Sequence, residues 1–364
     1  MKQRNEHGGN IYKMARQSAG SAEYLDYSAN INPLGLADSV RSAIINKIGS
    51  IIHYPDTEGF ALKEAIAGHY GIAYETITLG NGAVELMYVL GHVLSPKRVL
   101  TAAPAFSEYE RTAEICGAPI RYIQLDEDKG FRIDAEAAAR ELKAGDLMFL
   151  GNPNNPTGMM LRREEITIIL KKAKACGAAV AVDESFIDFV KLSEQYTVRH
   201  LTAEYDNLIV LHSLTKFYAI PGLRLGFAVS CPQLRAKLEW GKDPWNVNSL
   251  AQEAGCAALR DDRYQEESRM LVNREKDHLY RALQSIEGLL PFPPSVNFML
   301  VKITKDGLTA GQVRQLMAER EQILIRDCSA YEGLSERFIR VAIKSHEQNL
   351  KLIEGLKRVV GELI

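Results

Sequence analysis

The chain has 364 residues, of which 46% are hydrophobic and 25% are charged, a composition typical of a globular protein with a large buried core. A formal net charge of -2 argues against a protein that binds nucleic acid or an anionic membrane surface, because the field of the whole chain would attract neither. The cysteines form no CxxC pair and no cluster with histidine, which argues against a structural metal site or a disulfide framework. They are Cys116, Cys176, Cys231, Cys256 and Cys328. We therefore expect a small-molecule partner.

The N-terminal stretch MKQRNEHGGNIYKMARQ contains no apolar segment of signal-peptide length. A run of about 18 apolar residues, which a membrane-spanning helix would need, occurs nowhere in the chain. These observations predict a cytoplasmic protein with reduced thiols and no membrane contact.

Residues 1–45 are predicted to form an irregular arm with a helix that packs against a smaller C-terminal lobe, and residues 46–280 to form a large domain. From about Thr76 to Cys231, helical stretches alternate with apolar runs, namely KRVLTAA, RYIQL, DLMFLG, AAVAVDE, NLIVLHSL and LGFAVS. Nearly continuous apolar runs suit strands that are covered by helices on both faces. The pattern therefore predicts an α/β domain with a mainly parallel sheet.

Residues 232–280 are predicted to form a long helix that is interrupted near Pro244. Residues 281–364 are predicted to form a small α+β domain, with strands in NFMLVKI, ILIRDC and RFIRVAI and helices in TAGQVRQLMAER and HEQNLKLIEGLKRVVGEL. Ligands of open α/β sheets bind beyond the carboxyl ends of the strands. Polar residues that directly follow apolar runs are therefore the first candidates for a site.

Two polar motifs follow predicted strands in the middle of the chain. GNPNNPTG, residues 151–158, has the asparagine, proline and glycine content of a sharp strand-to-helix turn, and alone it indicates no more than a turn. Asp183 and Glu184 directly follow the run AVAV. A carboxylate at this point could be a solvated strand end, a helix N-cap, or an acceptor for a cationic ring nitrogen.

Two further motifs could bind a carbonyl compound and an anion. The segment HSLTKFYAIPGLRLG places Lys216 and Arg224 in an otherwise apolar stretch, where a surface turn with solvated charges is one interpretation. A buried lysine amine is also a nucleophile for a carbonyl, and an arginine offers a planar fork for a phosphate. In LGNGAVEL, Gly80 and Gly82 precede a helical pattern whose free N–H groups could hold an anion.

Together these motifs supply what pyridoxal phosphate needs: an amine for its aldehyde, a carboxylate for its pyridine nitrogen, an amide for its phenolic oxygen and a cradle for its phosphate. The ordered series GNG, NPTG, DE and SLTKFYAIPGLR resembles the fold-type-I pyridoxal-phosphate enzymes of the aspartate-aminotransferase superfamily. The resemblance implies a large α/β domain with a mainly parallel seven-stranded sheet, a smaller C-terminal α+β domain, and pyridoxal 5'-phosphate as cofactor.

The same resemblance implies a role for each motif residue. Lys216 would form the Schiff base with the cofactor, Asp183 would face its pyridine nitrogen, and Asn155 would face its phenolic oxygen. The phosphate would be held by Ser213, Arg224, Gly82 and Ala83, the last two through their backbone.

Two aromatic residues complete the implied cofactor site. Phe106 in APAFSEY stands where the family stacks an aromatic ring on the cofactor, and a core phenylalanine is the alternative interpretation. Tyr54 in HYPD matches a tyrosine that family members lend to the phosphate of the neighbouring subunit. We therefore expect a homodimer with shared active sites.

Two arginines in apolar runs are candidates for substrate binding, Arg326 in ILIRDC and Arg340 in RFIRVAI. In the superfamily, the arginine that matches Arg340 binds the substrate carboxylate or an equivalent anion. A buried arginine without a partner would be costly, so the pair predicts a substrate with two anionic groups.

The motifs HGGN, SANINPLG, PWNVN, ILIRDC and RVAIKS, together with the lysine segment, resemble the threonine-phosphate decarboxylases and, more distantly, the histidinol-phosphate aminotransferases. This resemblance implies decarboxylation of a phosphorylated amino acid, L-threonine O-3-phosphate, in cobalamin biosynthesis. The substrate-binding residues that it implies are His7, Gly8, Asn30, Asn155, Arg326 and Arg340.

Phe186 favours the decarboxylase, because aminotransferases of the superfamily generally carry a tyrosine three residues after the pyridine-facing carboxylate. A packing preference could also explain this phenylalanine. Ala83 and Val84 depart from the decarboxylase pattern, which has polar residues there, but the backbone cradle is unaffected. The alternatives are a histidinol-phosphate aminotransferase, a decarboxylase of L-serine O-phosphate, and a cofactor-binding regulator, which is disfavoured because no helix-turn-helix domain precedes the α/β core.

Overall fold

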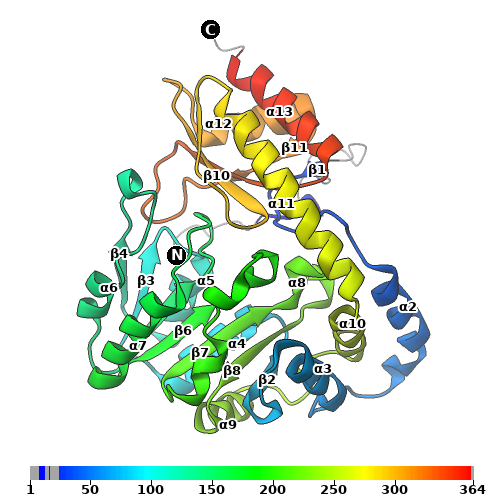
Figure 1. Cartoon of the computed structure of the whole chain (residues 1–364), viewed down its shortest axis with the longest axis vertical. Helices are drawn as coiled ribbons and strands as arrows, with labels where there is room; N and C mark the ends of the chain where they lie inside the picture. The colour runs from blue at the N-terminus through cyan, green and yellow to red at the C-terminus, as the bar shows by residue number, and fades with distance from the viewer. Residues whose placement is uncertain (1–7, 13–15, 17–23, 362–364) are drawn as a thin grey trace.

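A seven-stranded sheet forms the centre of the larger lobe in the computed structural model, which describes residues 8–12, 16 and 24–361 (Figure 1). Its strand order is β2-β8-β7-β6-β5-β3-β4, and β8 is the strand that runs antiparallel to its neighbours. The strands are β2 (Ile77–Gly80), β3 (Arg98–Ala103), β4 (Ile120–Gln124), β5 (Asp146–Gly151), β6 (Ala179–Asp183), β7 (Leu208–Ser213) and β8 (Gly226–Ser230). The predicted α/β fold with a mainly parallel sheet is confirmed.

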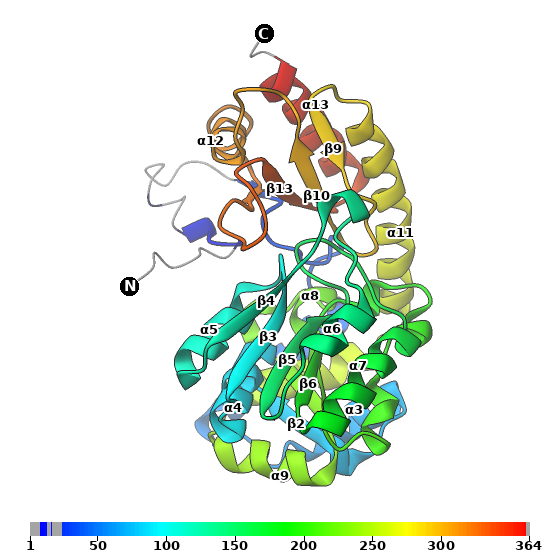
Figure 2. The same ribbon diagram turned by 90° about the vertical axis from the view of Figure 1, so that its left-hand side faces the viewer.

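Helices cover both faces of this sheet, and Figure 2 shows the strands between two helical layers. Side chains alternate between the faces, so Leu147 and Phe149 pack in one core while Met148 and Leu150 pack in the other. The helices are α2 (Asp38–Lys47), α3 (Phe60–Tyr70), α4 (Ala83–Leu94), α5 (Ser107–Cys116), α6 (Ala135–Glu141), α7 (Arg163–Cys176), α8 (Leu214–Phe217), α9 (Pro232–Gly241) and α10 (Ser249–Leu259). Burial on both faces explains why β5 to β8 are almost continuously apolar.

Short 3-10 helices connect several of these elements, and none of them is longer than five residues. They span Ile48–Ile52, Tyr74–Thr76, Glu127–Lys129, Ile187–Phe189, Ser193–Gln195, Arg199–Ala203 and Pro221–Leu223.

Among the described residues, no helix has both the length and the apolar character needed to cross a bilayer.

The long helix α11 (Asp262–Gln284) runs from the larger lobe to the smaller one (Figure 1). The predicted helix over residues 232–280 is in fact three helices with two breaks, at residues 242–248 and 260–261. The second break was not predicted; there the side chain of Asp261 accepts a hydrogen bond from the Tyr264 backbone and caps a new helix.

The smaller lobe contains an antiparallel sheet with strand order β12-β13-β10-β9, packed against α11, α12 (Ala310–Glu321) and α13 (His346–Gly361). Its strands are β9 (Leu289–Pro291), β10 (Phe298–Ile303), β12 (Arg326–Asp327) and β13 (Phe338–Ala342). Near the start of the chain, β1 (Leu25–Asp26) pairs in parallel with β11 (Ile323–Leu324). This pairing ties the N-terminal segment to the smaller lobe.

Candidate active site

Lys216 lies just beyond the carboxyl end of β7, in the short helix α8. Its Nζ donates to Oγ of Ser213 at 3.0 Å and lies 5.6 Å from the centre of the Phe186 ring. Burial lowers the pKa of Lys216 to about 8. The negative charge of Asp183 raises the pKa and so opposes this shift, while the positive charge of Arg224 lowers it further. The structure thus holds an amine that is partly neutral near pH 8 and can attack a carbonyl.

Asp183 ends the neighbouring strand β6, and its side chain is buried. Oδ2 accepts from the Tyr109 hydroxyl at 2.8 Å, and Oδ1 accepts from the Ser185 backbone at 3.0 Å. Burial, and then the charge of Asp183, raises the pKa of Tyr109 well above its usual range, so the phenol remains a donor. Two donors therefore fix the carboxylate in one orientation.

The adjacent Glu184 is also buried, but it serves a different part of the protein. Its carboxylate accepts from the Thr197 hydroxyl and the Val198 backbone, both at 2.7 Å, and pairs with Arg199 at 3.6 Å. Glu184 is therefore committed to holding the segment that follows β6.

A candidate anion cradle lies where the N-terminus of α4 approaches Arg224. Gly82, with φ 81°, precedes α4, and a Cβ at this position would lie 2.4 Å from Nη2 of Arg224. A Cβ on Gly226 would lie 2.6 Å from the backbone nitrogen of Ala83. These close approaches bring the first N–H groups of a 12-residue helix together with a guanidinium, a combination that suits a phosphate.

Asn155 and Arg340 meet between the two lobes. Nη1 of Arg340 donates to Oδ1 of Asn155, and Nη2 donates to the Ser28 carbonyl oxygen at 2.8 Å. Asn155 follows β5 of the larger lobe, whereas Arg340 belongs to β13 of the smaller one. The lobes therefore share this part of the site.

Arg326 stands directly opposite Arg340 in the register of β12 and β13, so both side chains leave the same face of the sheet. The two arginines are 9% and 5% exposed, and within the described part of the chain both Nε atoms lack a hydrogen-bond partner. Arg326 lies over the Tyr331 ring and Arg340 over the Phe298 ring, each at 5.5 Å. Two buried cations of this kind are stable beside an anionic ligand.

The N-terminal candidates are placed in part. His7 lies outside the described residues. A Cβ on Gly8 would lie 2.0 Å from the Ser28 carbonyl oxygen, which is the acceptor for Arg340. Asn30 is buried, and its Oδ1 has no hydrogen-bond partner among the residues the structure describes. Gly8 thus lies beside Ser28, near the pair of arginines, and Asn30 offers a free acceptor.

The two aromatic candidates occupy different environments. Phe106 directly precedes α5, and its ring meets the Tyr109 ring edge-on at 5.8 Å between centroids. Tyr54 is 79% exposed and lies 4.9 Å from the Trp245 ring. Phe106 therefore lies beside the residue that holds Asp183, whereas Tyr54 is on the surface of the chain.

Comparison with known proteins places this chain in a family. The family model of aminotransferase class I and II matches residues 22–356. The chain belongs to that family. A provisionally named threonine-phosphate decarboxylase of Caldanaerobacter subterraneus subsp. tengcongensis is 40% identical over 357 residues, 98% of this chain and 94% of the relative.

Threonine-phosphate decarboxylase of Salmonella typhimurium is 37% identical over 361 residues, 97% of this chain and 96% of that protein. The crystal structure of histidinol-phosphate aminotransferase from Clostridium acetobutylicum is 31% identical, with a TM-score of 0.86 over 93% of this chain and 99% of the other. The chain is thus similar along almost its whole length to a decarboxylase and to an aminotransferase of one fold.

The sequence motifs did not identify two residues that support the site. Tyr109, in α5, donates a hydrogen bond to Asp183. In the sequence, only its hydroxyl group separates it from an ordinary aromatic residue of the core. The Asn32 backbone donates to the Lys216 carbonyl oxygen at 3.0 Å, and its side chain donates to Phe217 O at 2.6 Å and Ser268 Oγ at 2.7 Å. The signal for Asn32 was its place in the motif SANINPLG.

A cluster of buried polar side chains surrounds His212, near the end of β7. His212, which precedes Ser213, bonds through Nε2 to Asp188 at 2.9 Å and to the Tyr70 hydroxyl at 3.0 Å. Burial raises the pKa of Asp188, but His212 and Arg199 outweigh this effect and lower the pKa to about 2. The ionised Asp188 thus holds the end of the strand that leads to Lys216.

Proposed function

We propose that this protein decarboxylates L-threonine O-3-phosphate with pyridoxal 5'-phosphate, giving (R)-1-amino-2-propanol O-phosphate for cobalamin biosynthesis in the cytoplasm. The observation that carries the proposal is the pair of buried arginines, Arg326 and Arg340, side by side on adjacent strands. A substrate with a carboxylate at one end and a phosphate at the other neutralises both.

The described residues fit the proposed cofactor group by group. Lys216 would hold its aldehyde, Asp183 would face its pyridine nitrogen, and Asn155 would face its phenolic oxygen. The phosphate would lie at the N-terminus of α4, held by the backbone of Gly82 and Ala83, by Arg224 and by Ser213, with Phe106 against the ring. When bound, the cofactor supplies an electron sink for the bond that breaks at the substrate α-carbon.

The substrate would lie between the lobes. Arg340 and Asn155, already in contact, would position its carboxylate, while Arg326, Gly8 and Asn30 would face its phosphate, with His7 joining them. By holding both anionic ends, these residues would fix the orientation of the substrate and so select which bond at the α-carbon breaks. The Nζ of Lys216 would then return a proton to the α-carbon, a role suited to an amine with a pKa of about 8.

A histidinol-phosphate aminotransferase is the second candidate, favoured by the similarity to the Clostridium acetobutylicum structure. Its phosphorylated substrate carries no carboxylate, which would leave one of the two arginines without an anion in that half of the reaction. Phe186 also argues against it, because an apolar ring rather than a hydroxyl lies beside the Lys216 amine. L-Serine O-phosphate differs from the proposed substrate by one methyl group, worth about 1–3 kcal/mol in an apolar pocket.

One assay separates these substrates. Purified protein with cofactor is incubated separately with threonine phosphate, serine phosphate, and histidinol phosphate plus 2-oxoglutarate, and carbon dioxide and glutamate are measured. We expect carbon dioxide from threonine phosphate at the highest kcat/KM, and no turnover by Lys216→Ala. Glutamate without carbon dioxide would reverse the order of the first two candidates.

The proposal includes a homodimer, supported by large apolar side chains exposed around α3 and α9. They are Ile51, Ile52, Tyr54, Phe60, Trp240 and Trp245, with exposures from 48% to 83%. A second copy of the chain would cover this surface and bring Tyr54 to the phosphate end of the partner's site.

A further inference from the structure

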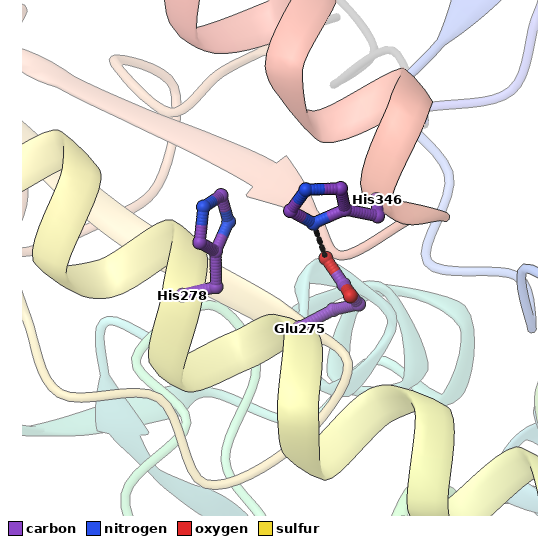
Figure 3. A group of neighbouring side chains, drawn as sticks. All are labelled: Glu275, His278 and His346. Atoms are coloured by element: carbon purple, nitrogen blue, oxygen red, sulfur yellow. Dashed lines mark hydrogen bonds and ion pairs between the residues drawn. The ribbon is translucent and has the colours of Figure 1, made fainter.

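A group of two histidines and one glutamate lies where α11 meets α13, and it has no part in the proposed reaction (Figure 3). Glu275 and His278 are three residues apart on α11 and so lie on one face of that helix. His346 is the first residue of α13. A carboxylate oxygen and one nitrogen from each imidazole lie within 4.8 Å of one another.

The carboxylate of Glu275 is 1% exposed and is held from two sides. Oε2 accepts from His346 Nδ1 and from Asn349 Nδ2, both at 3.2 Å, and Oε1 accepts from Arg274 Nε at 2.9 Å. Three donors thus fix both oxygens of this carboxylate in place.

His278 supplies a second, independent observation. Its Nδ1 is buried and, within the described part of the chain, has no hydrogen-bond partner, while its ring lies 4.6 Å from the His346 ring. A buried ring nitrogen without a partner is costly. The His346 side chain is 54% exposed, so an ion can reach the group from solvent.

We propose that Glu275, His278 and His346 bind one divalent transition-metal ion, with Zn²⁺ the best match to their chemistry. Two imidazoles and a carboxylate are a common zinc ligand set, with water in the fourth position, whereas Mg²⁺ and Ca²⁺ prefer oxygen ligands alone. Tetrahedral ligand atoms are about 3.4 Å apart. His346 Nδ1 and Glu275 Oε2 already lie at 3.2 Å, so only the longer distances in the group, which reach at most 4.8 Å, would have to shorten. Arg274 and Asn349 would orient the ligating carboxylate.

The ion would fasten α13 to the helix that joins the two lobes. His346 follows β13, the strand of Arg340, by four residues. Asn349 also accepts from the Tyr27 hydroxyl at 3.1 Å, which links the group to the segment before Ser28. Metal binding here would stabilise the smaller lobe, and it does not depend on which reaction the protein catalyses.

The test uses the full chain with its cofactor after treatment with a chelator. Calorimetric titration with Zn²⁺ should give one site per chain, and excess Zn²⁺ should raise Tm by roughly 2–5 °C. Co²⁺ in place of Zn²⁺ should give the visible absorption of a tetrahedral site, while Mg²⁺ should leave Tm unchanged. His278→Gln and His346→Gln should each weaken Zn²⁺ binding at least tenfold and abolish the Tm shift.

His200→Gln is the matched control, because His200 also faces a glutamate, Glu194 at 4.0 Å, on the surface. It should bind Zn²⁺ as the unaltered protein does. His346 is exposed, so His346→Gln is expected to keep the fold, which circular dichroism checks. Absence of saturable Zn²⁺ binding, or equal binding by all three variants, would overturn the proposal.

Discussion

At the scale of single residues, Lys216 is a buried amine that lies near one negative and one positive side chain. Burial lowers its pKa to about 8, Asp183 works against this shift, and Arg224 adds to it. The neutral amine, which is the nucleophile, therefore accumulates as the pH rises through about 8, more than two units below the usual range of lysine. Attachment of an aldehyde cofactor should follow this titration.

We expect the rate of pyridoxal-phosphate attachment to the cofactor-free protein to rise with pH to a plateau, with a midpoint near 8 by stopped-flow absorbance. Asp183→Asn removes the anion that favours the ammonium form, so the midpoint should move down. Arg224→Gln removes a cation, so the midpoint should move up. A free lysine derivative, whose midpoint should lie near 10.5, controls for titration of the cofactor itself. Shifts in the same direction for both variants would contradict this account of the site.

Among single residues, those at strand ends could be predicted from the sequence, and their distant partners could not. Asp183 and Lys216 follow apolar runs that end abruptly, and such runs in an α/β pattern indicate where ligands bind. Tyr109 lies 74 residues from Asp183, and its hydrogen bond depends on how α5 packs over the sheet. The residues next to Tyr109 in the sequence do not indicate this packing.

At the scale of elements, the register of β12 and β13 places two cations on one face of the smaller sheet. Like charges directly opposite each other on a sheet destabilise it by about 0.2–1 kcal/mol, and an anion between them reverses the sign. The charge pair was predictable from two arginines in apolar runs. Their direct opposition was not, because register depends on how the antiparallel strands pair.

Arg326→Gln should therefore separate stability from binding. In phosphate-free buffer the variant with cofactor should be at least as stable as the unaltered protein, because a like charge is removed from a buried pair. Its KM for threonine phosphate should rise by about 30-fold or more, since truncating a buried charged partner costs about 2–5 kcal/mol. Arg337→Gln, which alters an exposed arginine 3.4 Å from Asp306 just before β13, should change neither property. Large destabilisation without a change in KM would show that Arg326 is structural.

The junction between β2 and α4 offers a second test at this scale. Gly82→Ala would place a Cβ 2.4 Å from the Arg224 guanidinium at a φ of 81°, so the guanidinium must leave the cradle. We expect cofactor affinity, measured by fluorescence titration, to fall at least about tenfold, because the displaced guanidinium would no longer bind the phosphate and a hydrogen bond to a charged group contributes about 1.5–3 kcal/mol. Gly68→Ala is the control, since nothing lies within 4 Å of a Cβ there inside α3. It should keep the affinity and add about 0.5–1 kcal/mol of stability.

The hydrophobic pattern of the sequence predicted some strands and missed others. The six longer runs of the large lobe are all strands, and five of them are apolar because they are buried on both faces almost throughout. The sixth, β4, lies at the edge of the sheet and is half-buried or exposed along its length. The four-residue β2 and the three-residue β9 were not predicted, since each is too short to carry a pattern. The antiparallel direction of β8 was also not predicted, because it depends on the path of the chain between Ser213 and Gly226.

At the scale of the whole molecule, the proposed site contains residues of both lobes and, in the proposed homodimer, a residue of the second chain. Asn155 of the larger lobe contacts Arg340 of the smaller one, so the orientation of the lobes would affect substrate binding at the proposed site. Tyr54 is 79% exposed, far more than the buried residues around Lys216, which suits a tyrosine that acts in the site of a partner.

Mixing two inactive variants tests the shared site directly. Tyr54→Phe and Lys216→Ala proteins are each expected to have low activity. When they are mixed, unfolded together and refolded, half of the dimers carry one of each, and in those dimers one site regains both Lys216 and the partner's Tyr54. About a quarter of all sites should then be intact, and activity should return in proportion.

The control for this mixture is Lys216→Ala with Asp183→Asn, because both changes lie in the site of their own chain and leave no intact site in any mixed dimer. We expect no recovery in that mixture. Equal recovery in both mixtures would show that refolding, rather than complementation, restores activity. No recovery in either, with dimers present by light scattering, would place Tyr54 outside the partner's site and leave the exposed surface around α3 and α9 as a contact without a catalytic role.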